Sequence, residues 1–179
     1  ALLSRGNRML RSAVFAVCAV VSAAAASGAF SAPTAADDAV KVPPLKDFKW
    51  KCKFENGEAL GGYDDGEERF FLNTFGTASA EVTIPEEGEY TIFVEASCTA
   101  AEKELAKFKL TCGETVVAKE FATTTEDKKK YTFNAKLKKG KQSLAIEFLN
   151  DKFKEGEYDL NLFLHAVSIE PKKKEKEKE

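Results

Sequence analysis

Residues 88–98 have the sequence GEYTIFVEASC, in which apolar and polar side chains alternate along the whole stretch. Tyr90, Ile92 and Val94 fall on one face, as the period of a half-buried strand requires. The same alternation recurs in other stretches, at residues 48–54, 81–84, 107–112, 115–121, 131–137, 142–148 and 160–170. Apolar inner and polar outer positions are typical of antiparallel sheets that cover a core with one face.

Turn-forming sequences separate these stretches: PEEGE at 85–89, CGE at 112–114 and KKGK at 138–141. Only residues 99–106, TAAEKELA, have a helical pattern, and it is short. We therefore predict an all-β fold, an antiparallel β-sandwich of the jelly-roll type with one short helical segment. A chain of 179 residues has room for one such domain with its own core.

The first 29 residues predict export. Met9 begins a segment with the basic residue Arg11, an apolar run from Ala13 to Ala26 and small residues at 27–29, as in a signal peptide. The apolar run is too short and too rich in alanine for a membrane span. The mature protein is therefore expected in the periplasm, at the cell surface or in the medium, without a membrane span.

The composition divides the chain into four regions. Upstream residues and the signal peptide occupy 1–29, and a small, polar, Pro-containing linker follows at 30–44. The sandwich is expected over 45–171, and residues 172–179 form a mixed-charge tail that we expect to be disordered.

Three cysteines follow the predicted signal peptide, namely Cys52, Cys98 and Cys112. In an oxidising compartment two of them can form a disulfide. The pair Cys98–Cys112 is favoured because both residues end neighbouring predicted strands. The alternative is that all three are small buried apolar residues.

Charge and motifs exclude several classes of function. The formal net charge is −2, and Arg5, Arg8 and Arg11 lie in the signal region, so the remainder is acidic and lacks a nucleic-acid-binding character. The only histidine, His165, has no Ser or Cys partner in a recognisable motif, which argues against a hydrolytic triad. A pair of carboxylates at the separation that a glycosidase needs can be chosen from almost any acidic β-sandwich, so the acidic residues do not by themselves indicate a glycosidase. We predict a binding protein and not an enzyme.

Residues 150–161, NDKFKEGEYDLN, form an oxygen-rich loop between two predicted strands. Carboxylates, amides and backbone carbonyls are the ligands that Ca²⁺ prefers. The loop is not an EF-hand, because Phe153 and Leu162 occupy ligand positions and strands flank it. On composition alone, a cation site and a solvated hairpin tip are both open.

The stretch IEFLNDKFKEGEYDLNLFLHAVSI (146–169) resembles the end of the calcium-dependent, xylan-binding carbohydrate-binding modules of families 36 and 60. Residues 75–97 and 133–148 resemble the strands that precede this end in those modules. The resemblance implies a Ca²⁺ whose shell is completed by sugar hydroxyls. The implied metal ligands are Asp151, Asp159, Asn150 and Asn161. The implied carbohydrate-binding residues are Phe153, Tyr158, Glu155 and Glu157, and for the two aromatics a role as loop anchors is equally open.

The chain departs from the family pattern at two places. The Asp-Arg-Asn of the family is Asp159-Leu160-Asn161 here, which removes a basic residue. The Val-Asp of the final strand is Leu164-His165, which removes a ligand of a second, structural calcium in related modules. We expect His165 to be a half-exposed strand residue.

The function implied is that of an exported, non-catalytic module that binds polysaccharide, xylan or a related β-glycan, through a calcium ion in its loop. A separate catalytic or envelope protein is a candidate second partner. The alternative is a structural or adaptor sandwich of an envelope protein, with a structural calcium and no sugar binding. Trp50, which alternates with core residues, is expected to be buried rather than to contact sugar.

Overall fold

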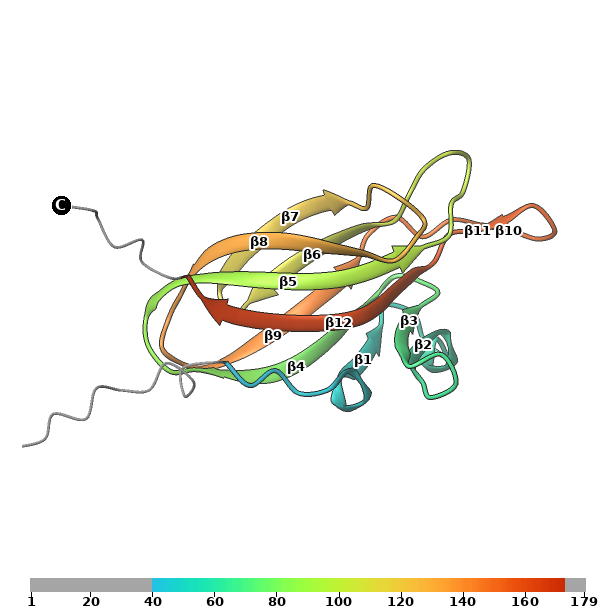
Figure 1. The fold of residues 1–179 in the computed structure, drawn as a ribbon. Helices are drawn as coiled ribbons and strands as arrows, with labels where there is room; N and C mark the ends of the chain where they lie inside the picture. The colour runs from blue at the N-terminus through green and yellow to red at the C-terminus, as the bar shows by residue number, and fades with distance from the viewer. Residues whose placement is uncertain (1–39, 173–179) are drawn as a thin grey trace, which may run out of the picture. The chain divides into compact units, whose positions relative to one another are not determined.

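The structure is a computed structural model, and it describes residues 40–172. These residues form two five-stranded antiparallel sheets around a shared apolar core, together with a small two-stranded hairpin (Figure 1). The prediction of an all-β antiparallel sandwich is thereby confirmed. The predicted signal peptide, and the tail from residue 173 onward, lie outside the described residues.

The two sheets are built from strands far apart in the sequence. The first sheet has the order β1 (Lys49–Cys52), β4 (Gly76–Ile84), β9 (Gly140–Phe148), β6 (Lys107–Cys112) and β7 (Thr115–Ala122). The second has the order β2 (Gly61–Asp64), β3 (Arg69–Leu72), β12 (Leu162–Pro171), β5 (Gly88–Cys98) and β8 (Lys129–Leu137). The hairpin pairs β10 (Phe153–Lys154) with β11 (Tyr158–Asp159). Two 3-10 turns complete the described part, η1 (Leu45–Asp47) and η2 (Glu58–Leu60).

Alternation along the central strands creates the core. In β5, Ile92 and Val94 are completely buried while their neighbours along the strand face outward. Three phenylalanines, Phe70, Phe108 and Phe148, are the largest fully buried side chains and come from both sheets. Burying each such side chain contributes about 1.5–3 kcal/mol, so the alternation selects which face of each sheet turns inward.

Some strand boundaries differ from the sequence prediction. The short strands β2 and β3 were not predicted, because Phe70, Phe71 and Leu72 are consecutive apolar residues that hide the period of two. Strand β4 begins at Gly76, five residues before the predicted start at 81. Strand β1 ends at Cys52, which leaves Phe54 exposed and not on the inner face.

The predicted helix at 99–106 is wrong. Ala101 and Glu104 instead pair through two backbone hydrogen bonds, of 3.0 and 2.8 Å, around a tight turn. Glu102 and Lys103 occupy the left-handed region, with φ of 51° and 70°. Contacts with distant parts of the chain override the helical propensity of this alanine-rich segment. Helical turns occur in η1 and η2 instead.

Trp50 is half-buried, not fully buried as predicted. Its ring lies between two glycines, since a Cβ added at Gly61 or Gly76 would come within 2.3 or 2.2 Å of the indole. The indole N–H donates a hydrogen bond to the carbonyl of Gly57 at 3.3 Å. Glycine is thus required at both positions for the ring to fit.

The three described cysteines are free, so the favoured Cys98–Cys112 disulfide is wrong. Cys98 ends β5 in the second sheet and Cys112 ends β6 in the first. Both thiols are buried, and burial raises the pKa of Cys112 to about 11. Cys52 is half-buried.

The first described residue already packs against the sandwich. Val40 is 7% exposed and forms a β-bridge with Ile169. This end of the predicted linker therefore contacts the sandwich. Between residues 40 and 172 no helix is long and apolar enough to cross a membrane.

Candidate functional site

The acidic loop, residues 149–161, connects β9 of the first sheet to β12 of the second. Figure 1 shows its hairpin, β10 and β11, projecting from one end of the strands. Gly156 makes the turn of the hairpin with a φ of 72°. The hairpin register pairs Phe153 with Asp159, and the Leu160 N–H donates to the Lys152 carbonyl at 2.8 Å. Residues far apart along the loop are thereby brought side by side.

A pocket of about 320 Å³ opens beside this hairpin. The acidic loop supplies Asp151, Phe153 and Asp159, and the rest of the wall comes from Leu60, Asn73 and Thr74. Leu60 ends η2, while Asn73 and Thr74 lie between β3 and β4. Three separate parts of the chain therefore meet at this pocket.

Asp151 is the key group of the pocket. Its Oδ2 accepts a hydrogen bond from the Thr74 hydroxyl at 2.9 Å, but its buried Oδ1 has no hydrogen-bond partner in the described part of the chain. Burial raises the pKa of the Asp151 carboxyl, the bond from Thr74 opposes this shift, and the charge of Asp159 adds to it. An unpaired carboxylate oxygen beside a second carboxylate is an environment that a cation stabilises.

Asn73, another residue of the pocket wall, also has a side-chain oxygen without a partner in the described structure. Its side-chain Oδ1 is buried and, within residues 40–172, accepts no hydrogen bond. Its backbone N–H donates to the carbonyl of Leu60 at 2.8 Å, which fixes the strand end next to η2. The sequence prediction missed Asn73 and Thr74, because Thr74 precedes Asp151 by 77 residues and neither lies in a recognisable motif.

Apolar side chains border the polar wall. Phe153 is 69% exposed and Leu60 is 43% exposed. They are two of the four large apolar side chains that are exposed in the described structure, and both line the pocket. Tyr158, the other aromatic predicted to contact sugar, does not line it. The residue is half-buried, and its hydroxyl donates to a Glu102 carboxylate oxygen at 3.3 Å, so it has the contacts of a loop anchor.

The two predicted amide ligands also lie outside the pocket wall. Both polar atoms of the Asn150 side chain are used by the backbone, since Oδ1 accepts from Lys107 N–H at 2.6 Å and Nδ2 donates to the Leu105 carbonyl at 3.0 Å. Asn161 is 7% exposed, and its buried Oδ1 has no hydrogen-bond partner among the residues described. Asn161 Nδ2 donates to the Asp159 carbonyl at 3.4 Å.

The two predicted glutamates are exposed. Glu157 forms an ion pair with Lys154 at 2.6 Å, and neither Glu155 nor Glu157 lines the pocket. The structure therefore brings together three of the eight predicted site residues, Asp151, Phe153 and Asp159. Over the described range no group of three or more His, Cys, Asp or Glu side chains is placed to hold a metal, so a cation here would need amide, carbonyl or external oxygens as well.

His165 lies outside this site, as expected, on the outer face of β12 where the pairing with β5 shifts register. It is half-buried, and its Nε2 lies 2.8 Å from the Ser97 hydroxyl oxygen, within hydrogen-bonding distance. Burial lowers the pKa of His165, Lys128 and Arg69 lower it further, and Glu95 opposes them.

The comparisons with solved structures concern the fold. The chain is similar to a family 36 carbohydrate-binding module from a multidomain xylanase of the hindgut metagenome of Trinervitermes trinervoides, with a TM-score of 0.55 and 10% identity over 75% of this chain and 98% of that one. A family 36 module in complex with calcium and xylotriose matches with a TM-score of 0.49 and 14% identity, over 70% of this chain and 94% of that one. The first of these matches shows that the chain has the fold of a family 36 carbohydrate-binding module.

A family model identifies the particular family. The model of the Ca-dependent, xylan-binding carbohydrate-binding modules of family 60 matches residues 91–179, and over these residues the chain belongs to that family. The resemblance inferred from the acidic loop is therefore confirmed. No curated protein sequence matches the chain.

Proposed function

We propose that this chain is a non-catalytic module that binds polysaccharide through a calcium ion held in the pocket beside the acidic loop. Asp151 and Asp159 would be the charged ligands and Asn73 an amide ligand. The polysaccharide would be xylan or a related β-glycan, as the family description suggests. The observation that carries the proposal is the buried Asp151 Oδ1, which has no partner among the described residues, in a pocket that Asp159 also lines.

The energetics of this carboxylate favour a cation. A half-buried carboxylate with one buried oxygen unpaired is costly to ionise, so a nearby positive charge would stabilise the ionised form of Asp151. The raised pKa of Asp151 reflects that cost. A bound calcium ion would supply the positive charge, and the unpaired Asp151 Oδ1 would be one of its ligands.

The ligand count leaves room for sugar. Ca²⁺ takes six to eight oxygens, and the pocket side chains supply fewer than that. Backbone carbonyls, waters and the vicinal hydroxyls of a sugar ring would complete the shell. Because Ca²⁺ accepts flexible geometry, exchange of water for a diol is compatible with the site.

Phe153 would provide the apolar part of the contact. Its ring is 69% exposed at the pocket edge, where an ordinary core aromatic would be covered. Aromatic rings bury large apolar area at little conformational cost, and the CH-rich face of a pyranose is a suitable partner. Among the predicted carbohydrate-binding residues, Phe153 is therefore the one we assign to sugar contact.

The alternative, a structural or adaptor sandwich with a structural calcium and no sugar binding, is favoured by one observation. Leu160, which stands where the family has Arg, is completely buried and lies outside the pocket wall. A basic sugar contact at that position is therefore not available. The experiment below separates the two functions.

Calorimetric titration of the mature chain with Ca²⁺, then with soluble xylan, and again with xylan in EDTA, tests the proposal. We expect calcium binding and a glycan response that EDTA removes. Asp159→Ala should abolish both, whereas Glu155→Ala, an exposed carboxylate of the same loop, should change neither. Phe153→Ala should weaken glycan binding alone, with Phe54→Ala, also exposed but away from the pocket wall, as its control. Calcium binding without a glycan response would favour the structural role, and no calcium binding would refute the proposal.

Export and the lack of catalysis belong to the same proposal. Polysaccharides of this kind lie outside cells, and Met9 with the apolar run after it predicts a cleaved signal peptide. N-terminal sequencing of the secreted protein would give the cleavage site. Incubation with xylan should release no new reducing ends.

A further inference from the structure

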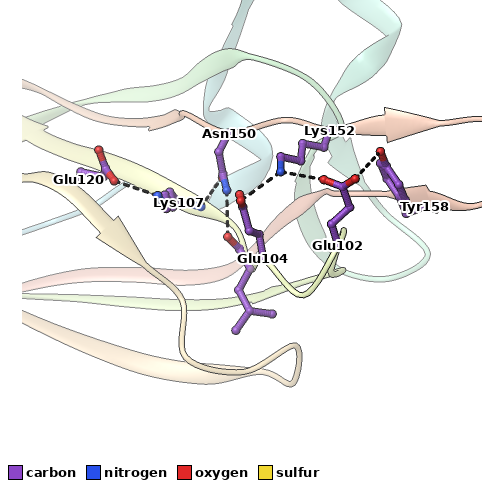
Figure 2. A network of polar contacts seen from close by, with 8 residues as sticks. Glu102, Glu104, Lys107, Glu120, Asn150, Lys152 and Tyr158 are labelled. Atoms are coloured by element: carbon purple, nitrogen blue, oxygen red, sulfur yellow. Dashed lines mark hydrogen bonds and ion pairs between the residues drawn. The ribbon is translucent and has the colours of Figure 1, made fainter.

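The segment Thr99–Lys107, between β5 and β6, contacts the acidic loop along most of its length. Its partners in the loop are Asn150, Lys152, Tyr158, Asp159 and Asn161. Figure 2 shows part of this network, in which Glu102, Glu104 and the backbone next to Lys107 lie against the loop. None of these segment residues lines the pocket. The segment thus contacts the loop without taking part in the pocket wall.

Thr99 holds the end of the loop that carries Asp159. Its hydroxyl donates to the Asp159 backbone carbonyl and accepts a hydrogen bond from the Asn161 N–H at 2.8 Å. Its own N–H donates to the Asn161 carbonyl at 3.2 Å. Both backbone neighbours of the fully buried Leu160 are therefore fixed by one residue. The Asp159 carboxylate is exposed and has no ion pair in the described structure, so its position follows from its backbone.

Glu102 holds the base of the hairpin. One carboxylate oxygen accepts from the Lys152 ammonium at 3.1 Å and the other from the Tyr158 hydroxyl at 3.3 Å (Figure 2). Glu104 accepts from the same ammonium at 3.1 Å. Lys152 directly precedes β10 and Tyr158 begins β11, so Glu102 contacts the chain on both sides of the base of the hairpin.

The turn that carries Glu102 is strained. Glu102 and Lys103 have positive φ values, a conformation that costs non-glycine residues about 1–3 kcal/mol each when it is imposed by the surrounding structure. Asn-Gly or Gly-Gly would fit such a turn with less strain. Glutamate at this position provides a carboxylate for Lys152 and Tyr158 that glycine or asparagine would not.

We infer that the segment Thr99–Lys107 holds the acidic loop in its binding conformation before a ligand arrives, with Thr99 as the residue that positions Asp159. The expected consequence, a higher affinity for calcium and glycan, rests on the proposed function. A loop ordered in advance loses less conformational freedom on binding, so ion and glycan bind more tightly. The preorganisation itself can be measured without any ligand.

Amide hydrogen exchange of the mature chain in EDTA measures that order directly. Thr99→Val removes the hydroxyl and keeps the shape of the side chain, so we expect faster exchange across residues 150–161. Thr99→Ser keeps the hydroxyl and should restore slow exchange. Thr83→Val, at an exposed position of β4, is the matched control and should leave the loop unchanged. Wild-type exchange in Thr99→Val would overturn the inference.

Calcium titration of the same variants links the order to function. Loss of two hydrogen bonds at Thr99 should weaken calcium binding about tenfold, with Thr99→Ser close to wild type. If wild-type protein binds no calcium, the proposed function fails while the exchange result still decides the inference. If Thr99→Val does not fold, Glu102→Gln gives the same exchange test at the hairpin. That substitution removes an exposed charge, and unchanged exchange at 152–158 would then refute the inference.

Discussion

The Asn150 side chain offers a sharp test, because the family resemblance and the structure assign it different roles. The resemblance implies a calcium ligand. In the structure its Oδ1 accepts from the Lys107 N–H at 2.6 Å and its Nδ2 donates to the Leu105 carbonyl at 3.0 Å. Replacement by alanine therefore removes a clasp between the acidic loop and the start of β6.

The cost of Asn150→Ala can be worked from these two bonds. The substitution leaves the Lys107 N–H and the Leu105 carbonyl without their partners. A buried group that loses its partner costs about 1–3 kcal/mol, and the half-exposed position allows water to replace part of each bond. We expect the free energy of unfolding to fall by about 2 kcal/mol, that is, about 1 kcal/mol for each bond.

Urea unfolding in EDTA measures this loss in the absence of the ion. With a typical slope of about 2 kcal/mol per M for a domain of this size, the midpoint should fall by about 1 M. Asn134→Ala is the control, because Asn134 lies on the exposed outer face of β8 and its Oδ1 accepts one bond, from the Thr91 hydroxyl. That variant should lose less than about 0.5 kcal/mol. Wild-type stability of Asn150→Ala in EDTA, together with weaker calcium binding, would refute the clasp and restore Asn150 as a ligand.

Two further predictions concern the sandwich itself. The fold lowers the pKa of His165, so the unfolded chain takes up its proton first as pH falls; the free energy of unfolding should be level above about pH 6.5 and decrease below it. Because His165 is the only histidine, NMR titration of its ring should give a midpoint below 6.5, and His165→Gln should have a flatter stability profile between pH 7.5 and 5.5; a midpoint above 6.5 would contradict the reasoning. Gly76→Ala places a methyl within 2.2 Å of the Trp50 ring and should cost about 1–3 kcal/mol in thermal or urea unfolding. Gly88→Ala, whose methyl would meet its nearest neighbour at 3.9 Å, should not destabilise, and equal losses in both variants would rule out the steric explanation.

The fold was largely predictable because its longer strands are half-buried. Half-buried strands can be predicted from the alternation of apolar and polar residues, and β5 has the predicted range of 88–98. Strands β2 and β3 were missed because Phe71 is an apolar residue on the outer face of β3, between the buried Phe70 and Leu72. Residues 99–106 were assigned to a helix because local propensity contains no information about Asn150, whose side chain bonds the backbone of Leu105.

The candidate site was predictable only in part, for a related reason. A local motif predicts Asp151, Phe153 and Asp159 as site residues, and in the structure all three line one pocket. The motif does not say which oxygens are free. The side-chain oxygen of Asn150 is used by the backbone, whereas the side chain of Asn73, brought in from another part of the chain, is not. That distinction depends on long-range packing, which a single sequence does not record.

The positions of the free thiols allow opening of the sandwich to be followed by cysteine alkylation. Cys98 and Cys112 are 4% and 2% exposed and belong to different sheets, so an alkylating reagent reaches them only when the sandwich separates. With a pKa of about 11, the Cys112 thiol is also almost entirely protonated near neutral pH and is a poor nucleophile in the folded state. Once exposed, a thiol returns to its ordinary reactivity. The rate at which these two cysteines are labelled would therefore record how often an interior strand of each sheet, β5 or β6, becomes exposed, with no introduced probe.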